Sequence, residues 1–396
     1  MFLMLRAHFP QFDFQRPEGW SFLRWPALVA REKATNPTRR QFVRVFGLEP
    51  EQFIDLTYVL MASVLSHKRR ILLKEFEPLR KSYGAAVNDY LDLVAPDLSS
   101  LRSALRKDLA TRKPLLRHEL YEFPFLKRYP FFRSRSREIS PWHVKVAARG
   151  LEEFVHWRLA KLSNEYTEPF SRLFERYVTE LTEAMSPQVV TETQYEVLFG
   201  SAAPKVEAIL PLKDCSIFVE AKMALFEDDV LLTDNETQAF NKTKHVRKAI
   251  KQGWEVAKTV RRADSLLPQC RTEGPDFLLV VTSRELGLGT GEQLQRLYPA
   301  DRFDYPDEAS RKLLPLTHVF TMSIMEFERL SVAVAGGSVC LPALLREAVE
   351  RNRDPTTSAI LFDMHLGRHV ENWGMPQLLE EARVSAEQRI HASLSR

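Results

Sequence analysis

The chain has 396 residues, 44% hydrophobic and 27% charged, a composition that excludes a disordered or fibrous protein. The net charge is only +4, but residues 1–150 contain 27 Lys and Arg against 15 Asp and Glu, a surplus of +12, so the remainder carries −8. Cys215, Cys270 and Cys340 are far apart and lack CxxC spacing, so the sequence indicates neither a zinc cluster nor a disulfide framework and favours a reducing cytoplasm.

Uncharged stretches are short throughout the chain. The longest, residues 330–345, contains two glycines and a proline and is shorter than the ~20 apolar residues of a membrane-spanning helix. Arg6 interrupts the apolar start, which leaves no core of signal-peptide length. We therefore expect a soluble, cytoplasmic protein with no membrane partner.

Residues 50–107 have apolar side chains at helical spacing, and strand patterns are scarce there. Pro124, Pro130 and Pro141 then exclude a continuous helix, so we place a domain connection here that includes an extended hairpin. This predicts a basic, mainly helical recognition or regulatory domain over residues 1–140 and a second domain over residues 141–396.

Two basic clusters lie in the first domain. They are "HKRR" at 67–70 and "RSRSR" at 133–137, and the candidate binding residues are Lys68, Arg69, Arg70, Arg133, Arg135 and Arg137. Closely spaced cations repel one another unless a polyanion or solvent screens them. The clusters therefore indicate contacts to nucleic-acid phosphates or to an acidic protein partner, and the alternative is a solvated basic surface.

The second domain begins with two amphipathic helices, over about 140–162 and 168–185. Strand patterns at 205–212 and 216–222, a long helix at about 236–262 and a strand at 276–282 follow, and then helices with a further strand near 317–324. This succession predicts an α/β fold in which helices flank a mixed central sheet and a helical extension follows.

The stretch "KVEAILPLKDCSIFVEAK" at 205–222 predicts a hairpin that turns at Lys213 and Asp214. A two-residue turn places Glu207 directly opposite Glu220, and Lys222 lies on the same face of the sheet. Asp214 is the competing acid, but six strand residues place it ~20 Å from Glu220, so we assign it to the turn.

Two facing carboxylates repel each other and favour a cation between them. Glu207 and Glu220 would hold Mg²⁺, or Mn²⁺ in its place, and leave further coordination positions to water and a substrate phosphate. Lys222 would stabilise the charge on the attacked phosphate or orient the attacking water. The alternative is a structural ion-pair network.

Glu207 followed by Glu220-Ala221-Lys222 on the second hairpin strand resembles the core motif of the PD-(D/E)xK, or restriction-endonuclease-like, nuclease superfamily. The resemblance covers residues 165–285, and Glu207 stands where the family usually has Asp. It implies a restriction-endonuclease-like sheet and a metal-dependent endonuclease that hydrolyses phosphodiester bonds of DNA or RNA, including tRNA.

The resemblance also implies two supporting positions. The family commonly has an acid on the helix before the hairpin, which Glu175 matches, and a glutamine or basic residue on the helix after it. Gln252 matches the second position. Lys244 and Lys248 precede it at intervals of four residues, so they lie on the same side of the helix and are candidate nucleic-acid-binding residues. For each of these residues the alternative is an ordinary exposed helix face.

A recognition domain joined to such a core resembles bacterial anti-phage defence nucleases, in which that domain senses a trigger. The resemblance implies a defence effector whose partners are nucleic acid and a protein trigger or regulator. Two alternatives stay open: a catalytically inert nucleic-acid-binding or scaffold protein, and a nuclease held silent until an acidic protein binds the basic domain.

Overall fold

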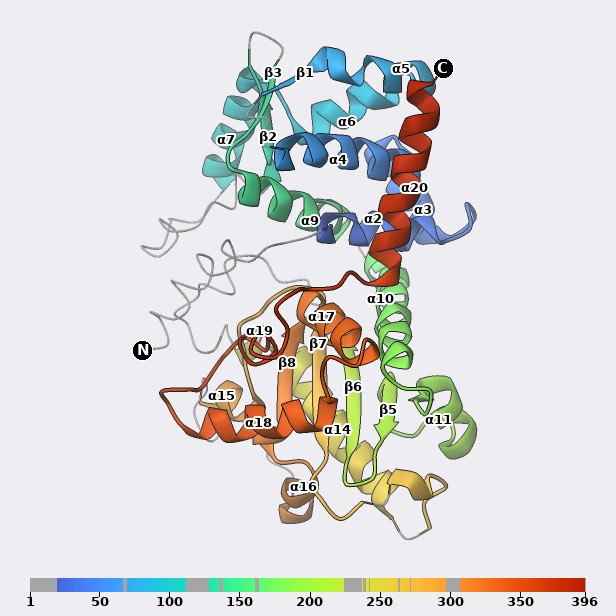
Figure 1. The fold of residues 1–396 in the computed structure, drawn as a ribbon, viewed down its shortest axis with the longest axis vertical. Coiled ribbons are helices and arrows are strands. Elements are labelled where there is room, and N and C mark those ends of the chain that lie inside the picture. Colours follow the sequence, from blue (N-terminus) through green and yellow to red (C-terminus); the bar gives the residue numbers. More distant parts are fainter. Residues whose placement is uncertain are drawn as a thin grey trace. The chain divides into compact units, whose positions relative to one another are not determined.

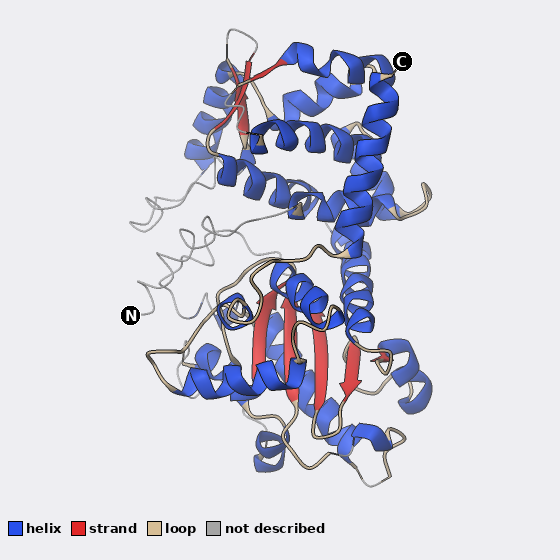
Figure 2. Ribbon diagram, in the orientation of Figure 1, coloured by secondary structure: helices blue, strands red, loops and turns tan. Residues whose placement is uncertain are grey.

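The computed structural model describes residues 20–66, 70–111, 128–134, 138–160, 164–223, 237, 240–241, 243–262, 264–270, 272–296 and 307–395. The contacts divide the chain into two compact units, shown in Figures 1 and 2. Unit 1 contains the described residues up to Leu173 together with those from Gln377 onward, and unit 2 spans Phe174–Pro376. The protein is a mixed α/β protein, mostly helical, with a five-stranded mixed sheet and a helical N-terminal region.

Unit 1 is built mainly of helices. They are α2 (Arg24–Ala30), α3 (Pro37–Phe46), α4 (Pro50–Leu65), α5 (Glu77–Tyr83), α6 (Ala86–Val94), α7 (Leu98–Thr111), α9 (Val144–Ala160), the first part of α10 (Asn164–Met185) and α20 (Gln377–Leu394), with the short 3-10 turns η1 (Ser21–Leu23) and η2 (Leu73–Phe76). Their core is aromatic: Phe53 lies 5.2 Å from Phe46 and 6.3 Å from Phe154 between ring centroids. Apolar burial of such rings is the main source of stability for this unit.

The hairpin expected among the prolines is present. It consists of β2 (Phe131–Arg133) and β3 (Glu138–Pro141), and β3 also pairs with β1 (Ile71–Leu72), so the sheet order is β1-β3-β2. The division between the units therefore differs from the boundary predicted at residues 140/141. The reason is that α9 packs against α2, α3 and α4 and so lies inside unit 1.

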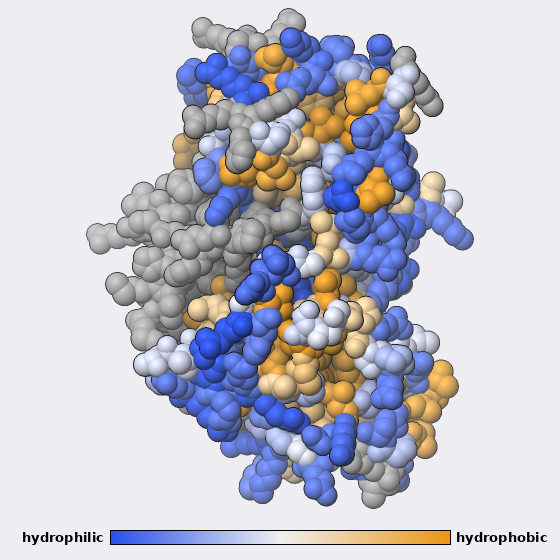
Figure 3. Space-filling model, in the orientation of Figure 1, coloured by the Kyte–Doolittle hydropathy of each residue, from blue (hydrophilic) through white to orange (hydrophobic). Residues whose placement is uncertain are grey.

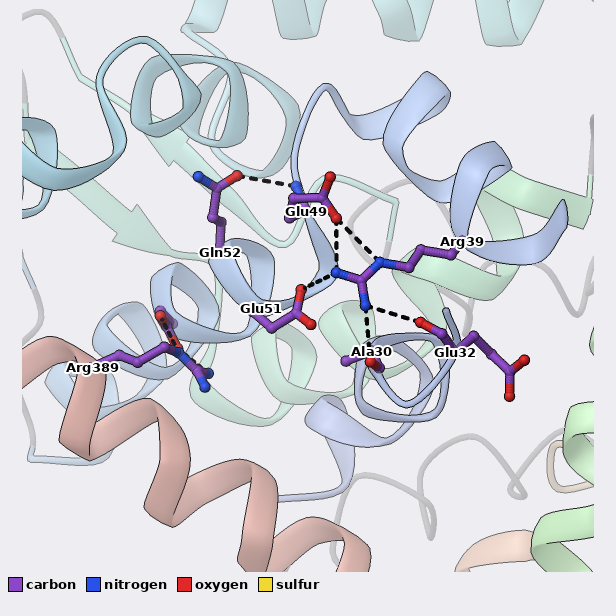
Figure 4. Close-up of polar contacts among 8 residues, drawn as sticks. Ala30, Glu32, Arg39, Glu49, Glu51, Gln52 and Arg389 are labelled. Atoms are coloured by element: carbon purple, nitrogen blue, oxygen red, sulfur yellow. Dashed lines mark hydrogen bonds and ion pairs between the residues drawn. The ribbon is translucent and has the colours of Figure 1, made fainter. Parts of the chain in front are cut away.

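Polar contacts fix the start of α4, as Figure 4 shows. The Arg39 guanidinium binds the carboxylates of Glu49 at 2.9 Å and Glu51 at 2.8 Å, and the Gln52 side chain accepts the Glu49 N–H. Gly47 closes the preceding helix at φ 67°, a left-handed conformation that favours glycine. The end of α3 and the start of α4 are therefore both held by specific backbone and side-chain contacts.

The helix α20 returns to unit 1 and packs on α2, α4 and α5. Its Arg389 binds both carboxylate oxygens of Asp55, with a shortest distance of 2.6 Å, and the Tyr83 hydroxyl donates to the same carboxylate at 2.5 Å. Asp55 is fully buried, so this bidentate pair satisfies a charge that would otherwise be costly. The last helix of the predicted C-terminal extension therefore belongs to unit 1.

A second buried ion cluster joins α2 to α9. Glu152 accepts hydrogen bonds from Arg24 at 2.7 Å and from Arg149 at 2.8 Å. Arg24 is 0% exposed and the other two side chains are nearly buried. Two guanidinium groups thus share one carboxylate in the interior of the unit, an arrangement that is stable only while all three members are present.

The sheet of unit 2 has the order β4-β5-β6-β7-β8. Its strands are β4 (Val190–Thr191), β5 (Ala208–Pro211), β6 (Ser216–Lys222), β7 (Phe277–Thr282) and β8 (Val319–Ser323). The pairs β4–β5 and β5–β6 are antiparallel, whereas β6–β7 and β7–β8 are parallel. The predicted strands are confirmed, and β4 is an edge strand that the sequence did not indicate.

Helices cover this sheet. They are the second part of α10, α11 (Glu192–Phe199), α14 (Lys244–Arg261), α15 (Gly291–Gln295), α16 (Glu308–Leu313), α17 (Ile324–Ala335), α18 (Leu341–Arg353) and α19 (Asp363–Leu366), with the 3-10 turns η4 (Pro268–Cys270) and η6 (Leu316–His318). α14 shares one buried core with Ile209, Phe218 and Leu278, while α17 contacts β7 and β8. Figure 1 shows α14 behind the sheet and α18 in front of it.

The surface of unit 2 is mixed in character. Figure 3 shows hydrophilic side chains along its lower helices and a group of apolar residues over α11. In α11, Tyr195 is buried in the core, whereas Val197 is 82% exposed. No helix among the described residues combines the length and the apolar character needed to cross a membrane.

Candidate active site

The hairpin of β5 and β6 has the predicted register. Ala208 pairs with Val219, and at the turn the Leu212 N–H donates to the Cys215 carbonyl at 3.0 Å. One step before the Ala208 pair, Glu207 lies opposite Glu220. Lys213 and Asp214 form the turn at the other end of the strands, and Asp214 lies 3.4 Å from Arg346. Asp214 is therefore not part of the carboxylate pair.

The two carboxylates lie inside the protein, where hydrogen bonds hold them. Glu207 is 7% and Glu220 1% exposed. Glu207 Oε2 accepts the backbone N–H of Ala221 at 2.9 Å, and Glu220 Oε1 accepts a hydrogen bond from the Lys222 ammonium. The Lys222 side chain is 19% exposed, so it reaches solvent from the same cluster. The structure thus brings together the three residues on which the sequence prediction depends.

Burial and mutual repulsion control the ionisation of this cluster. Burial first, and then the negative charge of Glu220, raise the pKa of Glu207 well above its ordinary value, and the two carboxyl groups are hydrogen-bonded to each other. Burial also raises the pKa of Glu220, although Lys222 opposes the shift. In the absence of a cation, burial and repulsion thus favour the protonated form of Glu207, while the Lys222 ammonium favours the ionised form of Glu220.

Glu175 of α10 belongs to the same electrostatic environment. Its charge contributes to raising the pKa of both Glu220 and Lys222. The described residues nevertheless contain no group of three or more His, Cys, Asp or Glu side chains placed to hold one metal ion. The cluster accordingly offers two protein carboxylates at most as direct ligands.

This donor set fits Mg²⁺ or Mn²⁺. Both carboxylates are hard oxygen ligands, and a cation would relieve the repulsion that raises the pKa of Glu207. Mg²⁺ is commonly held by one or two carboxylates, with water and substrate phosphates as its other ligands. Glu207 and Glu220 are therefore suited to hold such an ion without a third side chain.

The helix α14 borders the cluster. The Gln252 amide donates to the Lys205 carbonyl at 3.3 Å, two residues before Glu207. Its Oε1 atom is buried and accepts no hydrogen bond from the described part of the chain, so this acceptor is still available. Lys244 and Lys248 are exposed on the same helix.

His245, in the first turn of α14, was not among the predicted site residues. Partial burial, and then the positive charges of Lys222, Lys244 and Lys248, lower its pKa. A signal was present, because His245 lies seven residues before Gln252 and therefore on the same stripe of the helix.

The basic candidates of unit 1 show no common cluster in its described residues. Arg133 lies in β2, forms an ion pair with Asp92 and is 23% exposed. Arg70 is 72% exposed and lies 3.5 Å from Glu138. The other candidates, Lys68, Arg69, Arg135 and Arg137, lie outside the described residues. Arg133 therefore has a carboxylate partner within its own unit.

We expect Glu207→Gln to stabilise unit 2 at pH 8 in metal-free buffer. Because the folded-state pKa of Glu207 lies well above 4.5, the folded protein keeps a proton that the unfolded chain releases. The stability of the parent therefore falls as the pH rises above 4.5 toward that pKa, whereas glutamine does not titrate.

Calorimetry between pH 4.5 and 8 in a chelator measures this difference. The melting temperatures of parent and variant should converge at the acidic end. The prediction is wrong if the melting temperature of the parent, relative to that of the variant, does not fall as the pH rises. That result would show that ionisation of Glu207 does not destabilise the folded protein.

The chain was compared with models of protein families, with curated proteins and with solved structures, and none of the three comparisons found a match.

Proposed function

We propose that unit 2 is a metal-dependent nuclease of the PD-(D/E)xK type that hydrolyses phosphodiester bonds of DNA or RNA. The observation that carries the proposal is the hairpin register, which places Glu207 opposite Glu220 with Lys222 bonded to Glu220. In this proposal unit 1, which contains most of the strongly basic first 150 residues, recognises the nucleic acid or a trigger.

The order of elements supports the proposal. A helix that supplies an acid, α10, precedes three antiparallel strands, and α14 then leads to the parallel strand β7. The resemblance implies a helix with an acid before the hairpin and a helix with a glutamine or basic residue after it, and α10 and α14 stand in this order around β5 and β6. Two observations support the roles that the resemblance implies for Glu175 and Gln252. The charge of Glu175 contributes to the raised pKa of Glu220, and the Gln252 amide donates to the carbonyl two residues before Glu207.

The residues divide the chemistry among them. Bound between Glu207 and Glu220, Mg²⁺ would supply Lewis-acid stabilisation of the phosphate and lower the pKa of a coordinated water. An ammonium group has three donors, so Lys222 keeps two for a phosphate oxygen or the attacking water while one binds Glu220. The unsatisfied Oε1 of Gln252 can accept a hydrogen bond from water at the same edge.

One observation favours the alternative, an inert nucleic-acid-binding protein. Both carboxylates are almost fully buried and Lys222 is already paired, as in a structural ion-pair network. Cleavage and not binding is therefore the property that decides between the two functions.

The test is hydrolysis of plasmid DNA, single-stranded DNA, total RNA and tRNA with Mg²⁺, with Mn²⁺ and with a chelator. We expect cleavage that the chelator abolishes and that both Glu207→Gln and Glu220→Gln reduce at least ~100-fold, the cost of losing a group that acts in the transition state. Both variants keep the shape of the side chain, so the fold should survive.

Asp214→Asn is the matched control, because it also neutralises one carboxylate of the same hairpin but lies at the turn. It should cleave like the parent. Loss of cleavage in Asp214→Asn with full activity in Glu207→Gln would show that the upstream acid is wrongly assigned. If the parent cleaves none of the substrates, the nuclease proposal is wrong and the inert nucleic-acid-binding protein takes its place.

A further inference from the structure

The first half of α14 carries a stripe of exposed lysines, Lys244, Lys248 and Lys251, which we call the lysine stripe. Spacings of four and three residues place them on one side of the helix. Within the described ranges, none of the three has a carboxylate or a hydrogen-bond partner. The neighbouring Arg247, in contrast, bonds to the Phe240 carbonyl and stacks on its ring.

The basic residues in the second half of α14 are paired with carboxylates, which distinguishes them from this stripe. At the other end of α14, Lys258 lies 2.7 Å from Asp307, and Arg261 lies 2.6 Å from Asp276. The carboxylate within the helix, Glu255, lies 3.6 Å from Lys258. Uncompensated positive charge on α14 is therefore confined to the half that begins at Lys244.

This half lies beside the carboxylate cluster. α14 packs on β6, the strand that carries Glu220 and Lys222. The Gln252 amide of the same helix donates to the Lys205 carbonyl, two residues before Glu207. Lys244, Lys248 and Lys251 are neighbours on the exposed side of the helix, so their positive charges repel one another. A polyanion that binds there removes the repulsion and releases its own condensed counterions.

We propose that the lysine stripe binds the phosphodiester backbone on one side of the bond that is cut. From Lys244 to Lys251 the helix rises ~10 Å, the length of about three phosphates along one duplex strand. The placement relative to the cut bond rests on the proposed nuclease function, but backbone binding itself does not require cleavage. DNA and RNA share this chemistry, and the test distinguishes them.

Binding is measured in a chelator, so that no substrate is cut, with labelled duplex DNA, single-stranded DNA and RNA of one sequence. The variant Lys244→Gln/Lys248→Gln/Lys251→Gln should lower the slope of log affinity against log salt by about 2.7 for duplex DNA or ~2.1 for a single strand. Between 50 and 200 mM salt the parent then loses ~40-fold more duplex affinity than the variant. Replacement of the same three lysines by arginine should keep the parent's slope.

The matched control is Lys258→Gln/Arg262→Gln/Lys312→Gln, which removes three charges from the same unit. Each of these residues is paired with a carboxylate: Lys258 with Asp307, Arg262 with Asp264 and Lys312 with Glu308. Exposed pairs of this kind contribute little to stability, and the control should bind like the parent.

The outcomes separate this inference from the nuclease proposal. A parent that binds but does not cut with Mg²⁺, and whose slope falls only in the stripe variant, supports the lysine stripe and contradicts the nuclease. A parent that cuts while the stripe variant keeps its slope contradicts the stripe alone. The lysine-stripe proposal would also be overturned if the salt slope fell equally in the two triple variants. Absence of binding to all three nucleic acids would contradict it as well.

Discussion

Glu152→Gln will destabilise unit 1 by roughly 3–5 kcal/mol, the usual cost of removing one partner from a buried ion pair. The variant leaves Arg24 and Arg149 in the interior without the carboxylate that each of them binds. Hydrogen exchange of the α2 and α9 amides under native conditions measures the loss in unit 1 separately from unit 2.

Glu168→Gln is the control for this prediction. It removes the carboxylate of an ion pair with Arg172 whose side chains are both more than 70% exposed, and such pairs contribute at most ~1 kcal/mol. If Glu152→Gln lowers the free energy of unfolding of unit 1 by no more than Glu168→Gln does, the buried cluster does not stabilise the unit.

Acid sensitivity gives the same prediction a second readout. Burial alone would raise the pKa of Glu152, but the charges of Arg149 and Arg24 prevail and lower it to about 2. The carboxylate therefore stabilises the fold fully above pH 4.5, and this contribution is lost as the pH falls from 4.5 toward 2. Glu152→Gln should lack this part of the acid transition.

Lys222→Ala should reduce cleavage at least ~100-fold and leave binding of Mg²⁺ or Mn²⁺ intact. The ammonium is not a metal ligand, and its removal takes a positive charge away from Glu220. Titration calorimetry on metal-free protein, combined with the cleavage assay, separates this outcome from Glu220→Gln, in which both binding and cleavage should be lost.

Lys258→Ala is the matched control for Lys222→Ala, because it removes another paired lysine of unit 2. It should cut at the rate of the parent. If Lys222→Ala cuts at the parent rate as well, Lys222 is only the structural partner of Glu220, and the division of roles among the three residues is wrong.

The hairpin could be predicted in detail because its register depends on local information. A two-residue turn at Lys213 and Asp214 fixes every opposite pair, since side chains alternate between faces with a period of two. The edge strand β4 escaped prediction because two residues carry no alternation, and pairing with β5 defines it. Its existence depends on the tertiary structure.

The unit division could not be predicted for a related reason. The contact between Asp55 and Arg389 joins residues 334 positions apart, and no local pattern indicates that α20 packs on α4. The proline-rich stretch was a sound signal for a break in helix, but the break is a hairpin inside unit 1 and not a border between domains.

Within the candidate site, strand residues were easier to place than helix residues. Glu207, Glu220 and Lys222 follow from the register, whereas a helix stripe does not reveal which part of a sheet it faces. α14 packs on β6 and β7, and only this packing brings the Gln252 amide to the Lys205 carbonyl, three residues before β5. For Arg133 the sequence pattern indicated a free basic residue, but the tertiary structure pairs it with Asp92, which is 41 positions away.

The return of α20 makes unit 1 discontinuous in sequence, with the whole of unit 2 inserted between its parts. During synthesis on the ribosome, every residue of unit 2 is therefore made before the last helix of unit 1. Until residues 377–394 emerge, the buried carboxylate of Asp55 lacks its guanidinium partner, so the first-made part of the chain is the last to reach its final stability. All five strands of the unit 2 sheet and its carboxylate pair are therefore synthesised while unit 1 still lacks its last helix.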